Sequence, residues 1–219
     1  MKTCLYSLSY LDGLDNTGSS RLERQIKYVK YYSKLKEILG FEWIEFCDNN
    51  SSKENINNFI YAVSDQPGDI AFYSFPAHIP RGKDYDMGYV WRGLHYIREL
   101  IEDGYEKIIC IDSDGFVLTK RLADYIRNCN SGWVSLFNNY YNFPTAEMHI
   151  LNKDKFEFFM GYTSTDWRVL NGQCQEKVLP FSDIERNFNT LRIGEYPTTD
   201  VKYDFISQVP VSMKVELEK

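Results

Sequence analysis

Two carboxylates, Asp112 and Asp114, stand two positions apart directly after an apolar run in the sequence EKIICIDSDGFVL. The run 108–111 is typical of a strand buried on both faces, and ligands of α/β proteins gather beyond the carboxyl ends of such strands. Because Ser113 and Gly115 are small, they leave room for a cation with oxygen ligands and for phosphates that bridge it. A plain acidic turn is the alternative, since Asp, Ser and Gly also form turns.

The elements before this pair alternate between strands and helices. Residues 4–10 predict a first buried strand, and Ser20 with Glu23 forms a capping box at the start of a helix that Gly40 ends. Residues 41–47 predict a second strand that ends in Asp-Asn-Asn-Ser-Ser. Three such strand–helix units bring the carboxyl ends of the strands to one edge of a sheet. The other elements expected in this half are a helix capped by Ser51 and Glu54, a strand at 69–74 and a helix at 89–102.

The second half of the chain is less regular. Residues 163–180 have no clear period and are long enough to form a functional loop. Ser182 and Glu185 form a further capping box, which predicts a helix through Leu191. Alternation over 209–217 predicts a half-buried closing strand. The other expected elements are a helix from Thr119 or Lys120, strands at 133–137 and 148–151, and a short helix at 153–161.

Composition excludes several classes of function. The net charge of −6 and the pI of about 5.2 provide no global basic field to attract nucleic acid or an anionic membrane. The five cysteines are far apart and form no Cys-x-x-Cys pair, so we expect reduced thiols in a cytoplasmic compartment. No run approaches the 18 apolar residues of a membrane span, and no signal-peptide pattern is present. The length of 219 residues suits one domain.

Four stretches, in this order, resemble GT-A-fold glycosyltransferases with an Asp-x-Asp motif. They are FEWIEFCDNNSS at 41–52, the helix at 89–100, the Asp112-Ser113-Asp114 strand at 108–117, and EMHILNKDKF at 147–156. The resemblance covers roughly residues 3 to 190. It implies an α/β fold of the GT-A, Rossmann-like type in a single domain, with a mostly parallel central sheet flanked by helices and a small additional β element toward the C-terminus. Residues 1–118 would form the nucleotide-sugar-binding half and 119–219 the acceptor-side half.

The resemblance also implies an activity. The enzyme would move a sugar from a nucleotide-diphosphate sugar, with UDP-sugar favoured, to a hydroxyl of a saccharide, glycan or other acceptor. Mn²⁺ or Mg²⁺ would neutralise the leaving diphosphate. Asp114 would bind the metal, and Asp112 would hold it through water or contact the ribose. The other nucleotide-sugar contacts implied are Tyr6, Ser7 and Ser9 for base and ribose, Asp48 for the base, Arg92 for the diphosphate, and Ser113.

Two roles have weaker candidates. The histidines are His78, His95 and His149, and none matches the family's late metal ligand, although His149 is the candidate third ligand. An inverting enzyme needs a carboxylate to deprotonate the acceptor. Asp183 is the first candidate and Glu185 the second, although the capping box explains Glu185 without any chemistry.

Two alternatives stay open. Haloacid-dehalogenase-like phosphatases also place Asp-x-Asp-Gly after an apolar strand, and Asp112 would then be the nucleophile. Phe116 departs from the residue usual in that family after the Gly, and more than 100 residues precede the strand. The second alternative is a catalytically inactive nucleotide-sugar-binding domain. The sequence leaves the sugar, the acceptor, the stereochemical outcome and the oligomeric state open.

Overall fold

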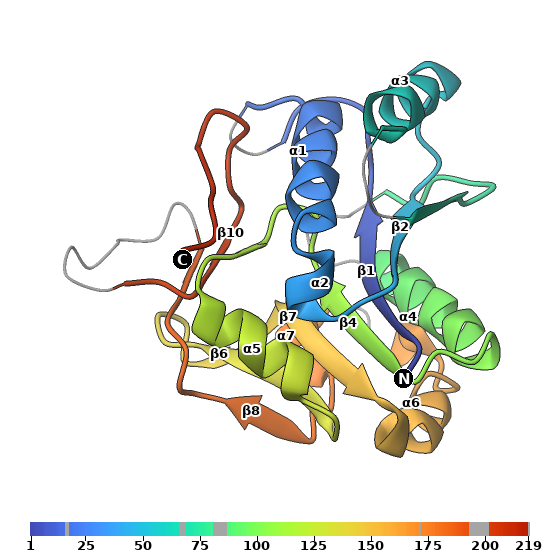
Figure 1. Ribbon diagram of the computed structural model, residues 1–219. Helices are drawn as coiled ribbons and strands as arrows, with labels where there is room; N and C mark the ends of the chain where they lie inside the picture. The colour runs from blue at the N-terminus through green and yellow to red at the C-terminus, as the bar shows by residue number, and fades with distance from the viewer. Residues whose placement is uncertain (16–17, 66–68, 81–86, 171, 193–201, 219) are drawn as a thin grey trace.

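A seven-stranded sheet organises the chain, and the computed structural model describes residues 1–15, 18–65, 69–80, 87–170, 172–192 and 202–218 (Figure 1). The four strands at one side run parallel, as the βα units of the sequence predict. The fifth strand is antiparallel to both its neighbours, and the last two are parallel to each other. The spatial order is β3 (Asp69–Ser74), β2 (Trp43–Asp48), β1 (Thr3–Ser9), β4 (Lys107–Ile111), β7 (Phe143–Asn152), β6 (Trp133–Asn138) and β8 (Asp183–Glu185).

A second sheet of three short strands lies beside the end of β4. β5 (Phe116–Val117) pairs antiparallel with β10 (Phe205–Ser207), which pairs parallel with β9 (Thr190–Arg192). The helices are α1 (Arg21–Ser33), α2 (Lys36–Leu39), α3 (Lys53–Val63), α4 (Met87–Glu102), α5 (Lys120–Asn128), α6 (Phe156–Tyr162) and α7 (Gln175–Val178), with 3₁₀ turns η1 (Lys153–Lys155) and η2 (Trp167–Val169).

Helices cover both faces of the central sheet. Alternate residues of β4 enter two hydrophobic clusters: Ile109 and Ile111 pack with α1 and α5, whereas Ile108 and Cys110 pack with α4. This alternation follows from the two-residue period of a strand. It confirms the prediction of a strand buried on both faces. In Figure 1, α1 and α5 lie in front of the sheet.

Several local predictions are confirmed. Ser20 accepts a hydrogen bond from the backbone N of Glu23 and caps α1, and Gly40 adopts a left-handed φ of 74° at the end of α2. One long helix was expected between them, but the helix breaks after Ser33 into α1 and α2.

All five cysteines are free thiols. In the described part of the chain, no helix has the length and apolar character that a membrane span requires.

The predicted helix after Ser182 is wrong, because this segment forms β8 and β9. The Ser182 hydroxyl accepts from the backbone N of Trp133 at 2.8 Å, and Ser182 N donates to Trp133 O at 2.9 Å. The residue therefore begins a strand pairing with β6 instead of capping a helix. The cap of α3 is also corrected: it is Ser52, which accepts from Asn55 N, and not Ser51.

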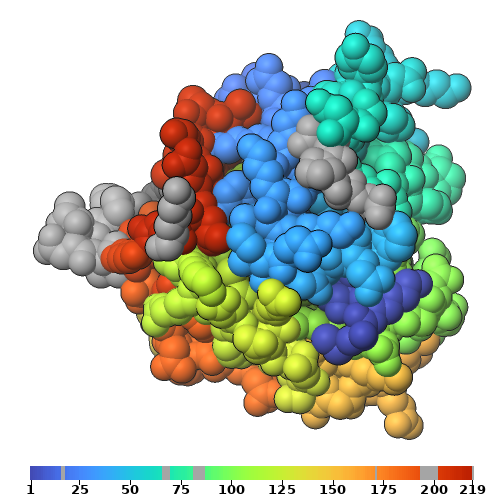
Figure 2. Space-filling view, in the orientation of Figure 1, coloured from blue at the N-terminus to red at the C-terminus, as the bar shows by residue number. Residues whose placement is uncertain are grey.

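The predicted closing strand at 209–217 is also wrong. The strand in this region is β10, and residues 208–218 form no strand. Lys27 of α1 donates to the carbonyls of Pro210 and Met213, and Glu218 N donates to Leu118 O at 2.8 Å. Side-chain and single backbone bonds thus hold this segment in place of a strand ladder. Figure 2 shows it, in red, lying directly against α1 in blue.

Candidate functional site

A cavity of about 700 Å³ opens at the carboxyl ends of β1 and β4. This is the edge of the sheet at which ligands of α/β proteins bind. The walls come from the ends of these strands, from α1 and α4, and from β9, with Gln175 and Leu179 contributed by the segment around α7. Six of the predicted contacts line the cavity: Tyr6, Ser7, Ser9, Asp112, Ser113 and Asp114.

The turn that carries the two carboxylates is held from both sides. Asp112 N donates to Glu147 O of β7 at 2.8 Å, and Gly115 N donates to Asp112 O at 2.7 Å. Val209 N donates to Asp114 O at 3.3 Å. A Cβ on Gly115 would lie 2.7 Å from Cζ of Phe205, so any other residue would force the turn or the ring of Phe205 to shift. Backbone bonds and close packing therefore fix where the carboxylates stand.

The first strand presents hydroxyl groups to the same cavity. Ser9 is buried, and Ser113 donates to its Oγ at 3.4 Å, which joins the ends of β1 and β4. The Tyr6 hydroxyl donates to Gly93 O of α4 at 3.2 Å. Burial raises the pKa of Tyr6 far above its usual range, so this group is a neutral donor. The predicted base- and ribose-lining residues thus lie together beside the carboxylates.

An arginine that the sequence patterns do not single out contacts Asp114. Nη1 of Arg24, on α1, lies 2.9 Å from Oδ2 of Asp15 and 3.5 Å from Oδ2 of Asp114. Its side chain is 14% exposed, and its Nε is buried without a hydrogen-bond partner among the described residues. Arg21, one turn earlier, also lines the cavity and lies over the ring of Tyr10 at 5.5 Å. Helical spacing of three residues places both arginines on one face of α1.

Two of the predicted contacts lie elsewhere. Asp48 is fully buried and accepts from Ser51 N at 2.8 Å and from Ser74 Oγ at 2.8 Å, so its carboxylate braces the loop after β2. Its neighbour Asn49 lines the cavity instead. Arg92 lies over the ring of Phe75 and lines a second, shallower pocket. Asp48 and Arg92 are therefore outside the wall of the main cavity.

Arg192 of β9 also lines the cavity, beside a largely buried carboxyl group. Its Nε lies 3.4 Å from Oε1 of Glu147. Burial raises the pKa of Glu147 to about 7, although hydrogen bonding by Ser207 and the charge of Arg192 oppose this shift. Neither residue could be recognised from sequence, because β7 and β9 meet only in the folded chain. Glu147 and Arg192 are too far apart in the sequence for any helix or strand periodicity to predict their contact.

His149 lies on the cavity wall, but its ring is engaged. Trp133 Nε1 donates to His149 Nδ1 at 3.2 Å. An indole N–H can only donate, so the hydrogen of the neutral imidazole sits on Nε2, which then has no lone pair for a metal. Burial lowers the pKa of His149 to about 3. This arrangement suits a structural histidine and gives no support to a third metal ligand.

The two candidate bases are not in the cavity. Asp183 and Glu185 belong to the edge strand β8, separated from β4 by β7 and β6. Asp183 is exposed and accepts from Ser182 Oγ at 2.9 Å, and Glu185 accepts from Asn187 N at 2.7 Å. Asp183 and Glu185 lie away from the cavity because Ser182 pairs with Trp133, which places residues 183–185 along the edge of the sheet.

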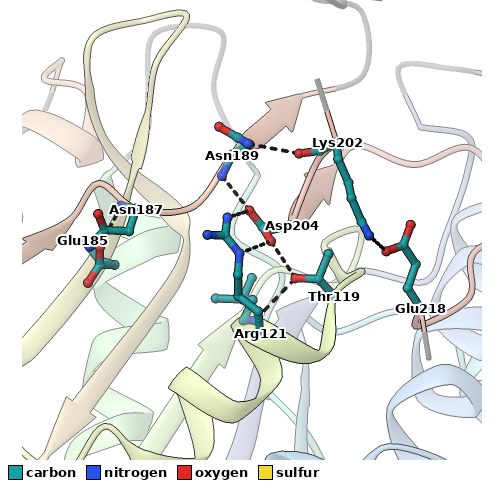
Figure 3. A network of polar contacts seen from close by, with 9 residues as sticks. Thr119, Arg121, Glu185, Asn187, Asn189, Lys202, Asp204 and Glu218 are labelled. Carbon is teal, nitrogen blue, oxygen red and sulfur yellow. Dashed lines mark hydrogen bonds and ion pairs between the residues drawn. The ribbon is translucent and has the colours of Figure 1, made fainter. Parts of the chain in front are cut away.

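Asp204 fixes the second sheet to the start of α5 (Figure 3). Its buried carboxylate accepts from Thr119 Oγ1 at 2.6 Å, Arg121 Nε at 3.1 Å and Asn189 N at 2.8 Å. Burial acts to raise the pKa of Asp204, but these hydrogen bonds outweigh it and lower the pKa. Because Leu118 N donates to Asp204 O, the segment after the carboxylate turn is tied into the same network.

Asp112 and Asp114 are the candidate ligands for a divalent cation, and the side chains around them show whether a cation would fit. Among the described residues, no group of three or more His, Cys, Asp or Glu side chains is placed to hold a metal ion. Mg²⁺ in phosphate sites, however, commonly takes only one or two carboxylates and completes its shell with phosphate oxygens and water. Asp112 and Asp114 therefore fit a hard cation that binds together with a phosphate-bearing ligand.

No family model and no curated protein sequence matches this chain. Solved structures with a similar fold do exist. The bifunctional glycosyltransferase WbbM superposes with a TM-score of 0.57 at 13% identity, over 94% of this chain but only 45% of WbbM. The galactosyltransferase LgtC, in complex with donor and acceptor sugar analogs, gives a TM-score of 0.52 at 11% identity, over 93% of this chain and 86% of LgtC.

A third similar structure belongs to a different class of transferase. A protein assigned as a glucose-1-phosphate thymidylyltransferase from Bacillus anthracis gives a TM-score of 0.52 at 8% identity, over 84% of this chain and 86% of that one. At such identities the likeness concerns the fold. The fold is the mixed α/β, GT-A type with a mostly parallel central sheet and a small second sheet, as the sequence predicts.

Proposed function

We propose that this chain is a glycosyltransferase that uses a nucleotide-diphosphate sugar, with a UDP-sugar as the favoured donor and a hydroxyl of a saccharide or other molecule as acceptor. One observation carries the proposal. The Asp112–Asp114 turn at the end of β4 opens onto a cavity that is also lined by hydroxyl-bearing residues of β1 and by arginines of α1 and β9. Carboxylates, hydroxyls and guanidinium groups together suit the metal, the ribose and the phosphates of such a donor.

The residues divide by chemistry. Asp112 and Asp114 would hold Mn²⁺ or Mg²⁺, whose charge offsets the negative charge that develops on a diphosphate leaving group. Tyr6, Ser7 and Ser9, which line the cavity, would bind and orient the nucleoside. Arg192 would form bidentate hydrogen bonds to phosphate, a geometry that a planar guanidinium favours.

Apolar side chains complete the wall. Leu94 and Ile97 of α4 line the cavity together with Leu179. Their burial keeps water away from part of the site, which strengthens the electrostatic interactions within it and protects a reactive donor from hydrolysis. Asp183 and Glu185 receive no role in this proposal.

Calorimetric titration with UDP-, GDP- and dTDP-sugars, with and without Mn²⁺, tests the proposal. A UDP-sugar should bind wild type in the presence of Mn²⁺, and Asp114→Asn should weaken that binding at least about tenfold, since one lost charge-assisted ligand costs roughly 1.5–3 kcal/mol. Asp124→Asn is the matched control, because Asp124 pairs with Lys120 on the exposed side of α5. The proposal is wrong if wild type binds no nucleotide sugar, or if Asp114→Asn binds the UDP-sugar with the affinity of wild type.

The alternatives are separated in the same preparation. Turnover of a generic phosphate ester with a burst of aspartyl-phosphate at Asp112 would identify a phosphatase. Binding of a nucleotide sugar without hydrolysis or transfer would identify a binding domain. Because a thymidylyltransferase shares the fold, pyrophosphate release from dTTP and glucose 1-phosphate is also measured, and it would identify nucleotidyl transfer.

A further inference from the structure

The charges that line the cavity balance one another. Among the described lining residues, the charged side chains are three arginines, Arg21, Arg24 and Arg192, and three aspartates, Asp15, Asp112 and Asp114. Arg24 contributes to this balance by direct contact with Asp15 and Asp114. A divalent cation alone or a diphosphate alone would each upset the balance, whereas a divalent cation together with the doubly negative diphosphate of a nucleotide sugar preserves it.

Arg24 is in contact with the carboxylate that a cation would need. Its Nη1 lies 3.5 Å from Asp114 Oδ2, at the edge of the cavity and with little exposure to water. A cation that binds Asp114 must weaken this ion pair, because like charges repel at such distances and are poorly screened where water is excluded. The guanidinium that is released can then offer its donors to phosphate oxygens.

The same guanidinium has a donor that is not used. Arg24 Nε is buried and has no hydrogen-bond partner among the described residues. An unpaired buried donor is unfavourable. A small shift of the guanidinium toward a bound anion would give this donor an acceptor, so the anion and the cation would each favour the same movement of Arg24.

From these contacts we infer that Arg24 couples the two ligands: it holds Asp114 until a divalent cation and a diphosphate bind together, and each of them raises the affinity for the other. This inference rests on the proposed function, because it names the same cavity and the same class of ligand. Coupling of this kind is reciprocal, and measured factors lie at about 5- to 150-fold.

The test is calorimetric titration of the folded protein with Mn²⁺ alone, with UDP or inorganic pyrophosphate alone, and with each in the presence of the other. In wild type, each ligand should raise the affinity of the other about tenfold or more. In Arg24→Gln, Mn²⁺ alone should bind about three- to tenfold more tightly, because Asp114 has lost its competing cation, and the coupling factor should fall toward one. Arg24→Lys is the second variant, for use if Arg24→Gln does not fold. It keeps the positive charge but loses the planar guanidinium, so it should change the affinity for Mn²⁺ and the coupling factor in the same direction but by less.

Arg21→Gln is the matched control. Arg21 lines the cavity from the same helix face but makes no ion pair with the described residues. Its substitution should weaken UDP binding and leave the affinity for Mn²⁺ alone within about twofold, since Arg21 pairs with no carboxylate in the described part of the chain. An Arg24→Gln variant that binds Mn²⁺ alone no more tightly than wild type, or that keeps the full coupling factor, overturns the inference.

The outcomes also separate this inference from the proposed function. If UDP-sugars bind with Mn²⁺ but Arg24→Gln leaves the affinity for Mn²⁺ alone unchanged, the inference is wrong and the proposed function stands. If Mn²⁺ and pyrophosphate couple through Arg24 while no nucleotide sugar binds, the proposed function is wrong and the coupling stands. Absence of binding by both pyrophosphate and nucleotides overturns both.

Discussion

Trp133 Nε1 donates a hydrogen bond to Nδ1 of His149, 3.2 Å away, between β6 and β7. Because the pKa of His149 is about 3 in the folded chain and about 6.5 in an unfolded one, the unfolded chain binds the additional proton as the pH falls below 6.5. We therefore expect His149 to lower the free energy of unfolding as the pH falls from 6.5 to 3, by up to about 1.4 kcal/mol per pH unit. Urea titrations at several pH values measure the slope.

The His149→Gln variant should have a shallower slope over this range, since it has no group that titrates at this position. Trp133→Phe is the control, because it removes the hydrogen bond but keeps the buried imidazole, and so should be less stable with the slope preserved. Equal slopes in wild type and His149→Gln would contradict this account.

Gly115→Ala should destabilise the fold by about 1–3 kcal/mol, the usual cost of overpacking. The reason is that a Cβ at this position would lie only 2.7 Å from Cζ of Phe205. Gly161→Ala is the matched control: nothing lies within 4 Å of the place that its Cβ would take, and it is in α6, so it should be neutral or stabilise by up to about 1 kcal/mol. Thermal unfolding compares the two. A Phe205→Leu substitution should recover part of the loss in Gly115→Ala, and a loss of stability shared equally by both glycine variants would contradict the packing argument.

Asp204→Asn should lower stability by about 2–4 kcal/mol, because it leaves Thr119, Arg121 and the Asn189 amide with a weaker acceptor in a buried site. The lower part of that range applies if water reaches the half-exposed Arg121. Asp124→Asn is again the control, since its exposed pair with Lys120 contributes only about 0.3–0.5 kcal/mol. Urea unfolding at pH 7 measures the free energy of unfolding of both variants. If Asp204→Asn and Asp124→Asn differ by less than about 0.5 kcal/mol, the hydrogen bonds of Asp204 do not stabilise the fold.

Two arginines distinguish the sequence-based assignment of the diphosphate site from the structural one. Arg92→Gln should leave UDP affinity within about twofold, because Arg92 lies outside the main cavity, whereas Arg192→Gln should weaken it about tenfold through loss of a charge-assisted contact. Competition binding in the presence of Mn²⁺ gives both values. A reversed order would restore the role predicted for Arg92 and remove Arg192 from the proposed site.

The fold could be predicted from the sequence wherever short-range rules apply. The Ser20 cap, the Gly40 stop and the buried run before Asp112 depend on neighbours within a few residues, and each is confirmed. Ser182 follows the same capping pattern, yet its partner is Trp133, far away in the sequence. A local pattern therefore cannot decide between a cap and a strand pairing.

The candidate site shows the same division. The carboxylates were predicted from the strand end that carries them, and the hydroxyls of β1 from the resemblance to GT-A-fold glycosyltransferases. Arg24 and Arg192 could not be predicted, because their approach to Asp114 and Glu147 depends on how α1 and β9 pack against the sheet. The resemblance to GT-A-fold glycosyltransferases implied a base contact for Asp48, but it could not show that Asp48 accepts hydrogen bonds from Ser51 N and Ser74 Oγ, outside the residues that line the cavity.

The hydrogen bond from Val209 N to Asp114 O has a consequence for the order in which the molecule is completed. A ribosome releases Asp114 well before it releases Val209, so a nascent chain presents both carboxylates while one side of their turn is still without support. Arg192 of β9 and Gln208, which also line the cavity, likewise follow both carboxylates in the chain. Under the proposed function, binding of a nucleotide sugar would therefore require that β9, β10 and Val209 have docked, and it would serve as a direct assay for that docking.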